Sequence, residues 1–166
     1  MVKQVHNPQQ NRRPRMRKLL LTGLLPILLL AGCDKRTLLH TYQPLDDSEW
    51  NRIDTVTFSL PVLTADDACS MVVGLRVTNR YPYELLVMEV EQQFQHPFAH
   101  RMDTIYYRLA DEDGILTEKG IYYFQYESEA LPLELKKGQT GEVRIRHLMH
   151  REILPGIMDV GIHIVR

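Results

Sequence analysis

The sequence predicts an all-β fold, an antiparallel β-sandwich of about seven to eight strands. Two observations predict this fold class. Apolar and polar residues alternate in a series of short runs, and turn-forming residues separate one run from the next. In addition, no segment repeats apolar residues at helical spacing over three turns. Strands that follow one another without helices between them favour an antiparallel sandwich over an α/β arrangement.

The first three strands are expected in the first half of the domain. Apolar residues alternate with polar ones over 56–60 and again over 71–77. The segment 79–82, Asn-Arg-Tyr-Pro, supplies turn-forming residues and ends the second strand. Over 86–94 one face is mostly apolar and the other carries glutamate and glutamine, which is typical of a strand with one wet face.

Alternation continues in the second half of the chain, where two turn signals divide it. The run Asp111-Glu112-Asp113-Gly114 has the residues of a tight turn, and 137–141 is a loop with two glycines. Residues 121–126 are aromatic and β-prone. The strands expected in this half are 103–109, 121–126, 143–147 and 160–164.

The first 32 residues have the features of a signal peptide. They carry no acidic residue and six basic ones, and an apolar run follows over 19–31. Those 13 residues would span only about 20 Å as a helix, against about 30 Å of bilayer hydrocarbon, so a permanent transmembrane helix is the poorer interpretation. The run ends in Leu30-Ala31-Gly32-Cys33, a pattern that lipoprotein signal peptidase cuts before the cysteine.

Cys33 is therefore the predicted lipidation site, and it divides the chain. We expect 1–32 to be the cleaved signal peptide, whether synthesis starts at Met1 or Met16. Residues 33–48 have few apolar side chains, a proline and scattered charge, which predicts a lipidated cysteine followed by a flexible tether. The β-sandwich domain is then expected over 49–166.

The lipid on Cys33 predicts the location of the mature protein. Acyl chains contribute about 0.8 kcal/mol per buried CH₂, so two or three of them hold a protein on a membrane. We expect an outer-membrane anchor. Lys35 and Arg36 follow the cysteine where an acidic export signal would stand, which favours a protein that faces the periplasm.

The net charge of the mature chain limits the classes of partner it can bind, and the cysteine content bears on its core. The chain carries 20 basic and 21 acidic residues, and removal of the six basic residues of 1–32 leaves 14 against 21. An acidic mature protein argues against nucleic acid or an anionic lipid surface as the partner, because such binding needs a basic face. Cys69 is the remaining thiol, and we interpret it as a small core residue.

The sequence contains no convincing catalytic or metal-binding set. His147 and His150 are three residues apart, so on a strand they point to opposite faces, and His96 and His100 lack a third ligand at a recognisable spacing. The acidic run at 111–114 lacks the remaining ligands of a calcium loop and reads as a plain turn. We therefore predict no metal, no cofactor and no enzymatic activity.

Several aromatic residues leave two interpretations open. They either form an exposed stripe that binds a sugar or a peptide, or they fill the core of the sandwich, which uses the same side chains. These residues are Tyr106, Tyr122, Tyr123, Phe124 and Tyr126.

A set of ordered features resembles the gliding-motility lipoprotein GldH family of the Bacteroidota over nearly the whole mature chain. Two features are the most particular. One is the turn Asn79-Arg80-Tyr81-Pro82-Tyr83, and the other is the terminal segment 156–164, which reads GIMDVGIHI. The others are Cys33, Trp50, Leu75 to Thr78, Leu85, Asp103-Thr104, Leu109 to Asp111, Gly114 and His147 to Met149.

The resemblance and the residue pattern together give candidate contacts for a partner. Proline fixes its own φ and restricts the residue before it, so Tyr81-Pro82-Tyr83 is expected to form a rigid exposed turn. Asp159 either caps a loop or contacts a partner. The candidate partner-binding residues are Trp50, Tyr81, Pro82, Tyr83, Asp103 and Asp159.

The resemblance implies an accessory lipoprotein of the envelope apparatus that drives gliding and associates with type IX secretion. It brings no catalytic residues, and its partners would be other envelope, gliding or secretion proteins. The alternative is a surface-exposed lipoprotein that binds a glycan or a peptide through the tyrosine residues. Loops 115–117 and 150–151 depart from the family pattern, which bears on the choice of partner more than on the fold.

Overall fold

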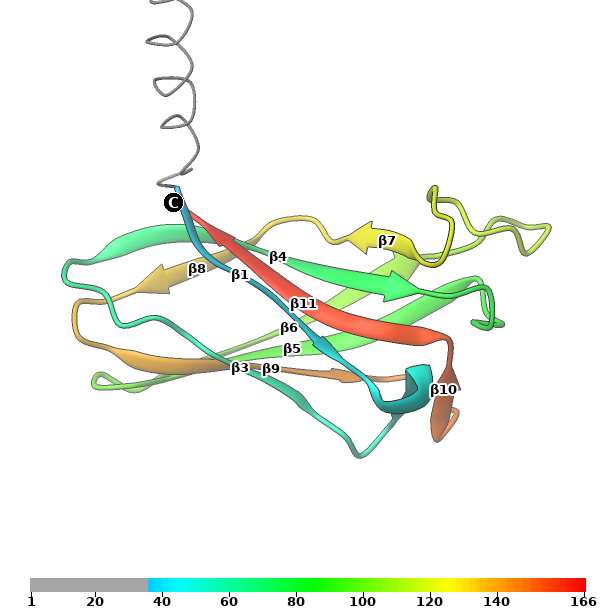
Figure 1. Cartoon of the computed structure of the whole chain (residues 1–166). Coiled ribbons are helices and arrows are strands. Elements are labelled where there is room, and N and C mark those ends of the chain that lie inside the picture. Colours follow the sequence, from blue (N-terminus) through cyan, green and yellow to red (C-terminus); the bar gives the residue numbers. More distant parts are fainter. Residues whose placement is uncertain (1–35) are drawn as a thin grey trace, which may run out of the picture. The chain divides into compact units, whose positions relative to one another are not determined.

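The computed structural model of the chain describes residues 36–166 (Figure 1). The signal peptide predicted over 1–32 and the lipidation predicted at Cys33 lie outside these described residues. Within 36–166, eleven strands and one short 3-10 helix follow one another along the chain. Their bounds are β1 Thr37–Pro44, η2 Asp46–Ser48, β2 Glu49–Asn51, β3 Val56–Ser59, β4 Asp67–Val77, β5 Leu85–Gln95, β6 Ala99–Arg108, β7 Phe124–Glu127, β8 Leu131–Leu135, β9 Thr140–His147, β10 Ile153–Pro155 and β11 Ile157–Val165.

The strands form two main antiparallel sheets that face each other (Figure 1). One sheet has the order β1-β11-β4, and β7 and β8 pair with two different halves of β4. The other has the order β3-β9-β5-β6, and β2 pairs with β10 as a separate two-stranded ribbon. All these pairings are antiparallel, so the predicted all-β, sandwich-like fold is confirmed.

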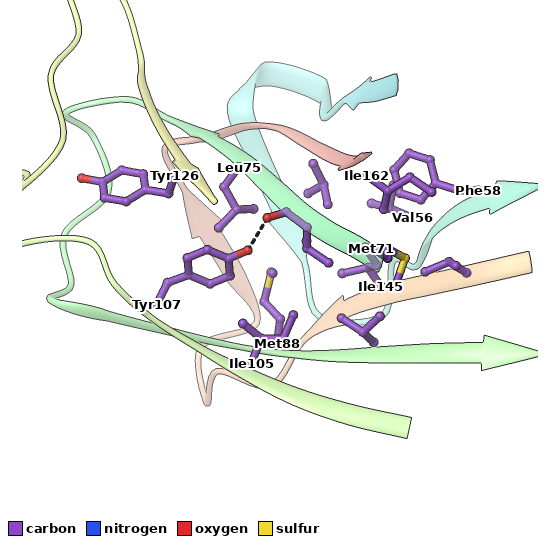
Figure 2. Close-up of a cluster of buried hydrophobic side chains, with 14 of the residues drawn as sticks. Val56, Phe58, Met71, Leu75, Met88, Ile105, Tyr107, Tyr126, Ile145 and Ile162 are labelled. Atoms are coloured by element: carbon purple, nitrogen blue, oxygen red, sulfur yellow. Dashed lines mark hydrogen bonds between the residues drawn. The ribbon is translucent and has the colours of Figure 1, made fainter. Parts of the chain in front are cut away.

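The core lies between the two sheets and is built from the alternating residues that the sequence showed (Figure 2). Leu75 of β4 and Ile162 of β11 face Met88 of β5 and Ile145 of β9, and all four are fully or almost fully buried. Two hydrogen bonds from buried tyrosine hydroxyls lie within this apolar core. The Tyr107 hydroxyl donates to the Val73 carbonyl oxygen at 2.7 Å and so connects β6 to β4, while the Tyr126 hydroxyl donates to the Leu109 carbonyl oxygen at 2.5 Å.

The flexible tether predicted over 33–48 is wrong for residues 37–48. Residues 37–44 form β1, which pairs with β11 from Thr37 opposite Val165 to Pro44 opposite Asp159, and 46–48 form η2. The domain therefore begins at residue 37 and not at 49. The segment looked polar and irregular because β1 is an edge strand with a half-exposed face, so it lacks a clean alternation of apolar residues.

One aromatic contact explains how β1 is held on the sheet. Tyr42 stands directly opposite Gly161 of β11, which stands opposite Gly74 of β4. The Tyr42 ring lies across both glycines, and a Cβ atom at Gly161 would come within 2.5 Å of that ring. Two successive strands therefore leave out a side chain so that one aromatic ring can cover the sheet.

Most of the other predicted strands are confirmed with shifted ends. β4, β5, β6, β9 and β11 all extend beyond the predicted runs. The aromatic run 121–126 is a strand only from Phe124, and residues 121–123 belong to a loop. The short strands β2, β8 and β10 were missed, because three to five residues give too little alternation to recognise.

The Tyr42 contact predicts a specific coupling. Gly161→Ala should lower the free energy of unfolding by about 1–3 kcal/mol, because the new methyl group displaces the Tyr42 ring. In a Tyr42→Ala background the same substitution should cost much less. Chemical denaturation of the four proteins of this double-mutant cycle measures the coupling, and additive effects would contradict the contact.

Candidate functional site

The structure brings four of the six candidate residues to one end of the sandwich. This end, here called the β2–β10 end, consists of η2, β2, the turn 78–84 and residues 148–156. Backbone bonds join its parts, since the Gly156 amide donates to the Ser48 carbonyl oxygen at 2.7 Å and the Thr78 amide donates to the Gly156 carbonyl oxygen at 2.8 Å. Trp50, Tyr81, Pro82 and Tyr83 lie here.

Trp50 is a core residue of this end and is not exposed to a partner. Its side chain is completely buried, and its indole Nε1–H donates to the Asp54 carbonyl oxygen at 3.2 Å. The indole also meets the His147 ring edge-on, with 5.4 Å between ring centroids. The interpretation of Trp50 as a partner-binding residue therefore does not fit the structure, and its role here is to hold β2 and β10 on the sandwich.

The turn that the sequence predicted as exposed is exposed at Pro82, half-buried at Tyr83 and buried at Tyr81. Tyr81 is buried, and its hydroxyl donates to the Leu85 carbonyl oxygen at 2.8 Å. Burial raises the pKa of this hydroxyl well above its usual value of 10.0. Pro82 is exposed, and the half-buried Tyr83 accepts a bond from the Arg151 guanidinium at 3.3 Å. The buried Tyr81 side chain thus attaches the turn to the core, and Pro82 and the exposed part of Tyr83 lie on the surface of the turn.

Gly156 makes this arrangement possible. Its φ is +86°, which lies in the left-handed region that glycine adopts without strain. A Cβ atom at this position would collide with the backbone of Tyr81. Glycine is therefore required where the β10–β11 turn passes the turn 78–84.

A hollow of about 590 Å³ lies beside Trp50 at the same end of the sandwich. Ile53, which is 81% exposed, belongs to its lining, as do two arginines and two histidines. Its lining residues are Arg52, Ile53, Thr55, Arg146, His147, Leu148, Met149 and His150. The sequence pattern did not point to this hollow, because Arg52 and Ile53 look like ordinary loop residues until β9 is placed beside them.

His147 forms part of the wall of the hollow and is held in its neutral form. Its side chain is only 1% exposed, and its Nε2–H donates to the Trp50 carbonyl oxygen at 3.2 Å. Among the described residues, Nδ1 has no hydrogen-bond partner. Burial lowers the pKa of this imidazole below 6.5, and Arg52 lowers it further, while the bond to Trp50 opposes the shift.

Asp159 lies in a different place, on the outer face of the β1-β11-β4 sheet. It is nearly buried, and its carboxylate is 3.7 Å from the Arg76 guanidinium on the neighbouring strand. That guanidinium lies 4.1 Å from the centroid of the Tyr42 ring and 5.1 Å from the centroid of the Tyr123 ring. An ion pair within the sheet, rather than a loop cap, therefore accounts for Asp159.

Asp103 is distant from the other candidates along the sheet, on strand β6. Its two carboxylate oxygens accept bonds from Arg101 of the same strand at 2.7 and 2.9 Å. β6 ends the order of its sheet, so this pair is on an edge strand. The six candidates therefore form no single site.

The cysteine and the acidic run that the sequence singled out have structural roles. Cys69 is buried, as expected, and burial raises the pKa of its thiol. The Asp111 carboxylate accepts bonds from the amides of Asp113 and Ile115, which makes the acidic run a self-capped turn. Among residues 36–166 no group of three or more His, Cys, Asp or Glu could hold a metal ion.

The tyrosines do not form one stripe. Tyr106 and Tyr122 are largely exposed, but Tyr106 is on β6 and Tyr122 is in the loop before β7. Tyr126 is buried in the core, and Tyr123 and Phe124 are half-buried. A continuous aromatic platform over these residues is therefore wrong.

The fold and this end together define an all-β sandwich domain with a partly basic hollow at one pole. A family model described as GldH lipoprotein matches residues 37–164, which runs from the first residue of β1 to the last but one residue of β11. The chain therefore belongs to the GldH lipoprotein family, as the sequence resemblance suggested.

Individual proteins agree with this family assignment. The chain is 30% identical over 148 residues to a protein of Flavobacterium johnsoniae described as gliding motility lipoprotein GldH, a match that covers 85% of this chain and 92% of that protein.

Two solved structures are similar to this chain at low TM-scores. One is Eiger TNF from S. frugiperda, with a TM-score of 0.37, 7% identity, and coverage of 80% of this chain and 94% of that one. The other is a CocE/NonD family hydrolase from Staphylococcus aureus, with a TM-score of 0.40, 12% identity, and coverage of 78% and 33%. Among residues 36–166, no helix has the length and apolarity needed to cross a bilayer.

The buried His147 predicts a pH dependence of stability. Its pKa is lower in the folded protein than in the unfolded chain, so the unfolded chain binds a proton first as the pH falls below 6.5. Wild-type stability should therefore decline from that pH downward, with a slope of at most about 1.4 kcal/mol per pH unit from this group. Denaturation of His147→Gln over the same range should show a shallower decline, and an equal slope would contradict this assignment.

Proposed function

We propose that this protein is a lipid-anchored, non-catalytic component of the gliding-motility or type IX secretion apparatus, with its sandwich facing the periplasm. The single observation that carries the proposal is the family match over 37–164, which spans the complete sandwich. The relative from Flavobacterium johnsoniae supports it, because that protein is described by its part in gliding motility and as a lipoprotein.

The anchor in this proposal is lipid on Cys33 after cleavage of residues 1–32. The run Leu30-Ala31-Gly32-Cys33 supports it, since small residues before a cysteine fit the signal peptidase and the thiol accepts the lipid. Lys35 and Arg36 support a protein that stays on the periplasmic side of the outer membrane. Protease treatment of intact cells separates the orientations, because a periplasmic domain should be spared and a surface domain digested.

The partner surface in this proposal is the β2–β10 end. Pro82 and Tyr83 present a turn that Tyr81 holds rigid, so little conformational entropy is lost when a partner binds there. The neighbouring hollow combines exposed Ile53 with the guanidinium of Arg52. That combination suits a protein segment with an apolar residue next to an acidic one. In this proposal Asp103 and Asp159 act within their own sheets and Trp50 supports the surface from the core.

Complementation in a deletion strain of the native host tests this proposal. Wild type should restore colony spreading or type IX-dependent secretion, whichever the host shows, and Cys33→Ala should fail because the protein leaves the membrane. Ile53→Asp should also fail while it still accumulates and sediments with membranes, because it places a charge at the rim of the hollow. Met102→Asp, at an exposed apolar residue of β6, is the matched control and should behave as wild type.

Two outcomes would contradict the proposal in different ways. Full function of Ile53→Asp would remove the hollow from the partner surface and leave the family role intact. A deletion strain without any envelope, secretion or motility defect would remove the family role itself. The surface glycan- or peptide-binding alternative would gain if protease digested the domain on intact cells.

A further inference from the structure

The opposite end of the sandwich is where β1 begins and β11 ends, and it has its own surface. This end, here called the anchor-side end, consists of Arg36, Arg166 and three loops, 60–66, 96–98 and 136–139. Figure 1 shows the β3–β4, β5–β6 and β8–β9 connections together at this end. The β2–β10 end lies at the other extreme of the same strands.

Bonds between the three loops make the anchor-side end one continuous surface. The Gly138 amide donates to the Leu63 carbonyl oxygen at 3.0 Å, and the Lys137 amide donates to the Asp66 carboxylate at 2.8 Å. The buried Gln139 side chain donates to the Pro97 carbonyl oxygen at 2.9 Å. These bonds fix the loop tips against one another.

The same network reaches the point where the described chain begins. The Arg166 amide donates to the Arg36 carbonyl oxygen at 2.9 Å, and the Arg166 guanidinium is 2.8 Å from the Asp67 carboxylate at the start of β4. Arg36 directly precedes β1, so the chain enters the domain beside the loop 60–66.

The chain between the predicted lipid and β1 is too short to hold the domain away from a bilayer. Thr37 is four positions after Cys33 in the sequence. A fully extended chain covers at most about 14 Å over four positions. Thr37 and Ser70 are at the same height along the strands, because both pair with Val165. β4 begins three residues before Ser70, at Asp67, and so extends beyond Thr37 towards the loop tips. That is about 10 Å of strand, so the loop tips can reach the same plane as Cys33.

The loop tips carry the chemistry of a membrane-interface surface. Phe98 at the tip of the β5–β6 hairpin is 67% exposed, and Val62 in the β3–β4 loop is 57% exposed. Lys136 and Lys137 occupy the third loop, between these two. An exposed aromatic and an aliphatic residue flanked by lysines match the pattern by which proteins sit in the headgroup region.

The charge of this end differs from that of the chain as a whole. The mature chain carries 14 basic and 21 acidic residues, which argued against an anionic lipid surface. At the anchor-side end, however, Lys136 pairs with Asp66 and Glu134, and Arg166 pairs with Asp67. Arg36 and Lys137 add two further bases, which makes four bases and three acids. The excess of acid lies elsewhere in the chain, so this end can approach lipid phosphates.

We infer that the anchor-side end is a membrane-docking surface, in which Phe98 and Val62 enter the headgroup region of the bilayer that holds the lipidated Cys33. This inference rests on the proposed lipid anchor. Docking fixes the orientation of the sandwich, so that the β2–β10 end points away from the membrane towards its partner. A lipid anchor on a free tether would leave that orientation random.

Quenching of tryptophan fluorescence by brominated lipids tests the docking. Trp50 is the chain's one tryptophan, and it is buried at the β2–β10 end, so the lipidated wild-type protein carries its own unquenched reference. The full-length protein is purified from membranes and placed in phosphatidylethanolamine–phosphatidylglycerol vesicles with or without bromine on the acyl chains. Phe98→Trp should then emit about twofold less light from its added tryptophan in brominated vesicles, because docking places that residue about 5–10 Å into the interface.

Two further variants make the test specific. Val62→Trp should be quenched like Phe98→Trp, which guards against a single misfolded variant. Tyr122→Trp is the matched control, and its emission should not change. Tyr122 is 87% exposed and lies two residues before Phe124, which pairs with Val77 at the end of β4 far from the anchor-side end.

The outcomes separate this inference from the proposed anchor. Flotation of wild type with vesicles and loss of flotation in Cys33→Ala establish the anchor. If wild type floats but Phe98→Trp and Val62→Trp are quenched no more than Tyr122→Trp, the docking is wrong and the anchor stands. If wild type fails to float, both the anchor and the docking are wrong.

Discussion

The pairing of β1 with β11 is the contact on which the rest of this structure depends. It adds residues 37–44 to the sheet as an edge strand and leaves three residues, 34–36, between Cys33 and the first residue of β1. Tyr42 secures the strand by lying across Gly161 and Gly74, and the Arg76 guanidinium stacks on that ring and also pairs with Asp159. Residues 37–44, which the sequence predicted as a flexible tether, are thereby part of the folded domain.

That constraint gives the two ends of the sandwich different surroundings. In the proposed function, lipid on Cys33 holds the anchor-side end within reach of the bilayer, whereas the β2–β10 end lies at the other extreme of the strands. At the far end, Trp50 and Tyr81 are core residues that support an exposed turn and the wall of a hollow. In the proposed function this arrangement has a use, because the domain would present one rigid surface to a partner at a fixed height and orientation.

Sequence reasoning reached the fold class and the family, because both depend on patterns within single segments. The alternation over 71–77 and 86–94 defines β4 and β5, and the turn at Asn79 to Tyr83 is visible in the residue types. Edge strand β1 was missed because its faces are both partly wet, and its value to the fold depends on glycines more than 30 residues and more than 100 residues away.

The candidate site was less predictable for a related physical reason. Aromatic residues such as Trp50 and Tyr81 look the same in a sequence whether they face a partner or fill a core, and only long-range pairing decides between the two. The hollow beside His147 needs β9 and the loop after β2 side by side, which no local pattern shows. For β1 the sequence did offer a signal. Gly74 and Gly161 stand inside strands, where glycine indicates the close approach of another part of the chain, here the Tyr42 ring.

Hydrogen exchange measures whether β1 belongs to the folded domain. The amides of residues 37–44 that bond to β11 should be protected to within about tenfold of those in β4, because both strands open only when the sheet does. Exchange of the β1 amides at the rate of an unstructured chain, with β4 and β11 still protected, would contradict the account. Residues 37–44 would then be a tether, and the orientation of the domain at the membrane would be free.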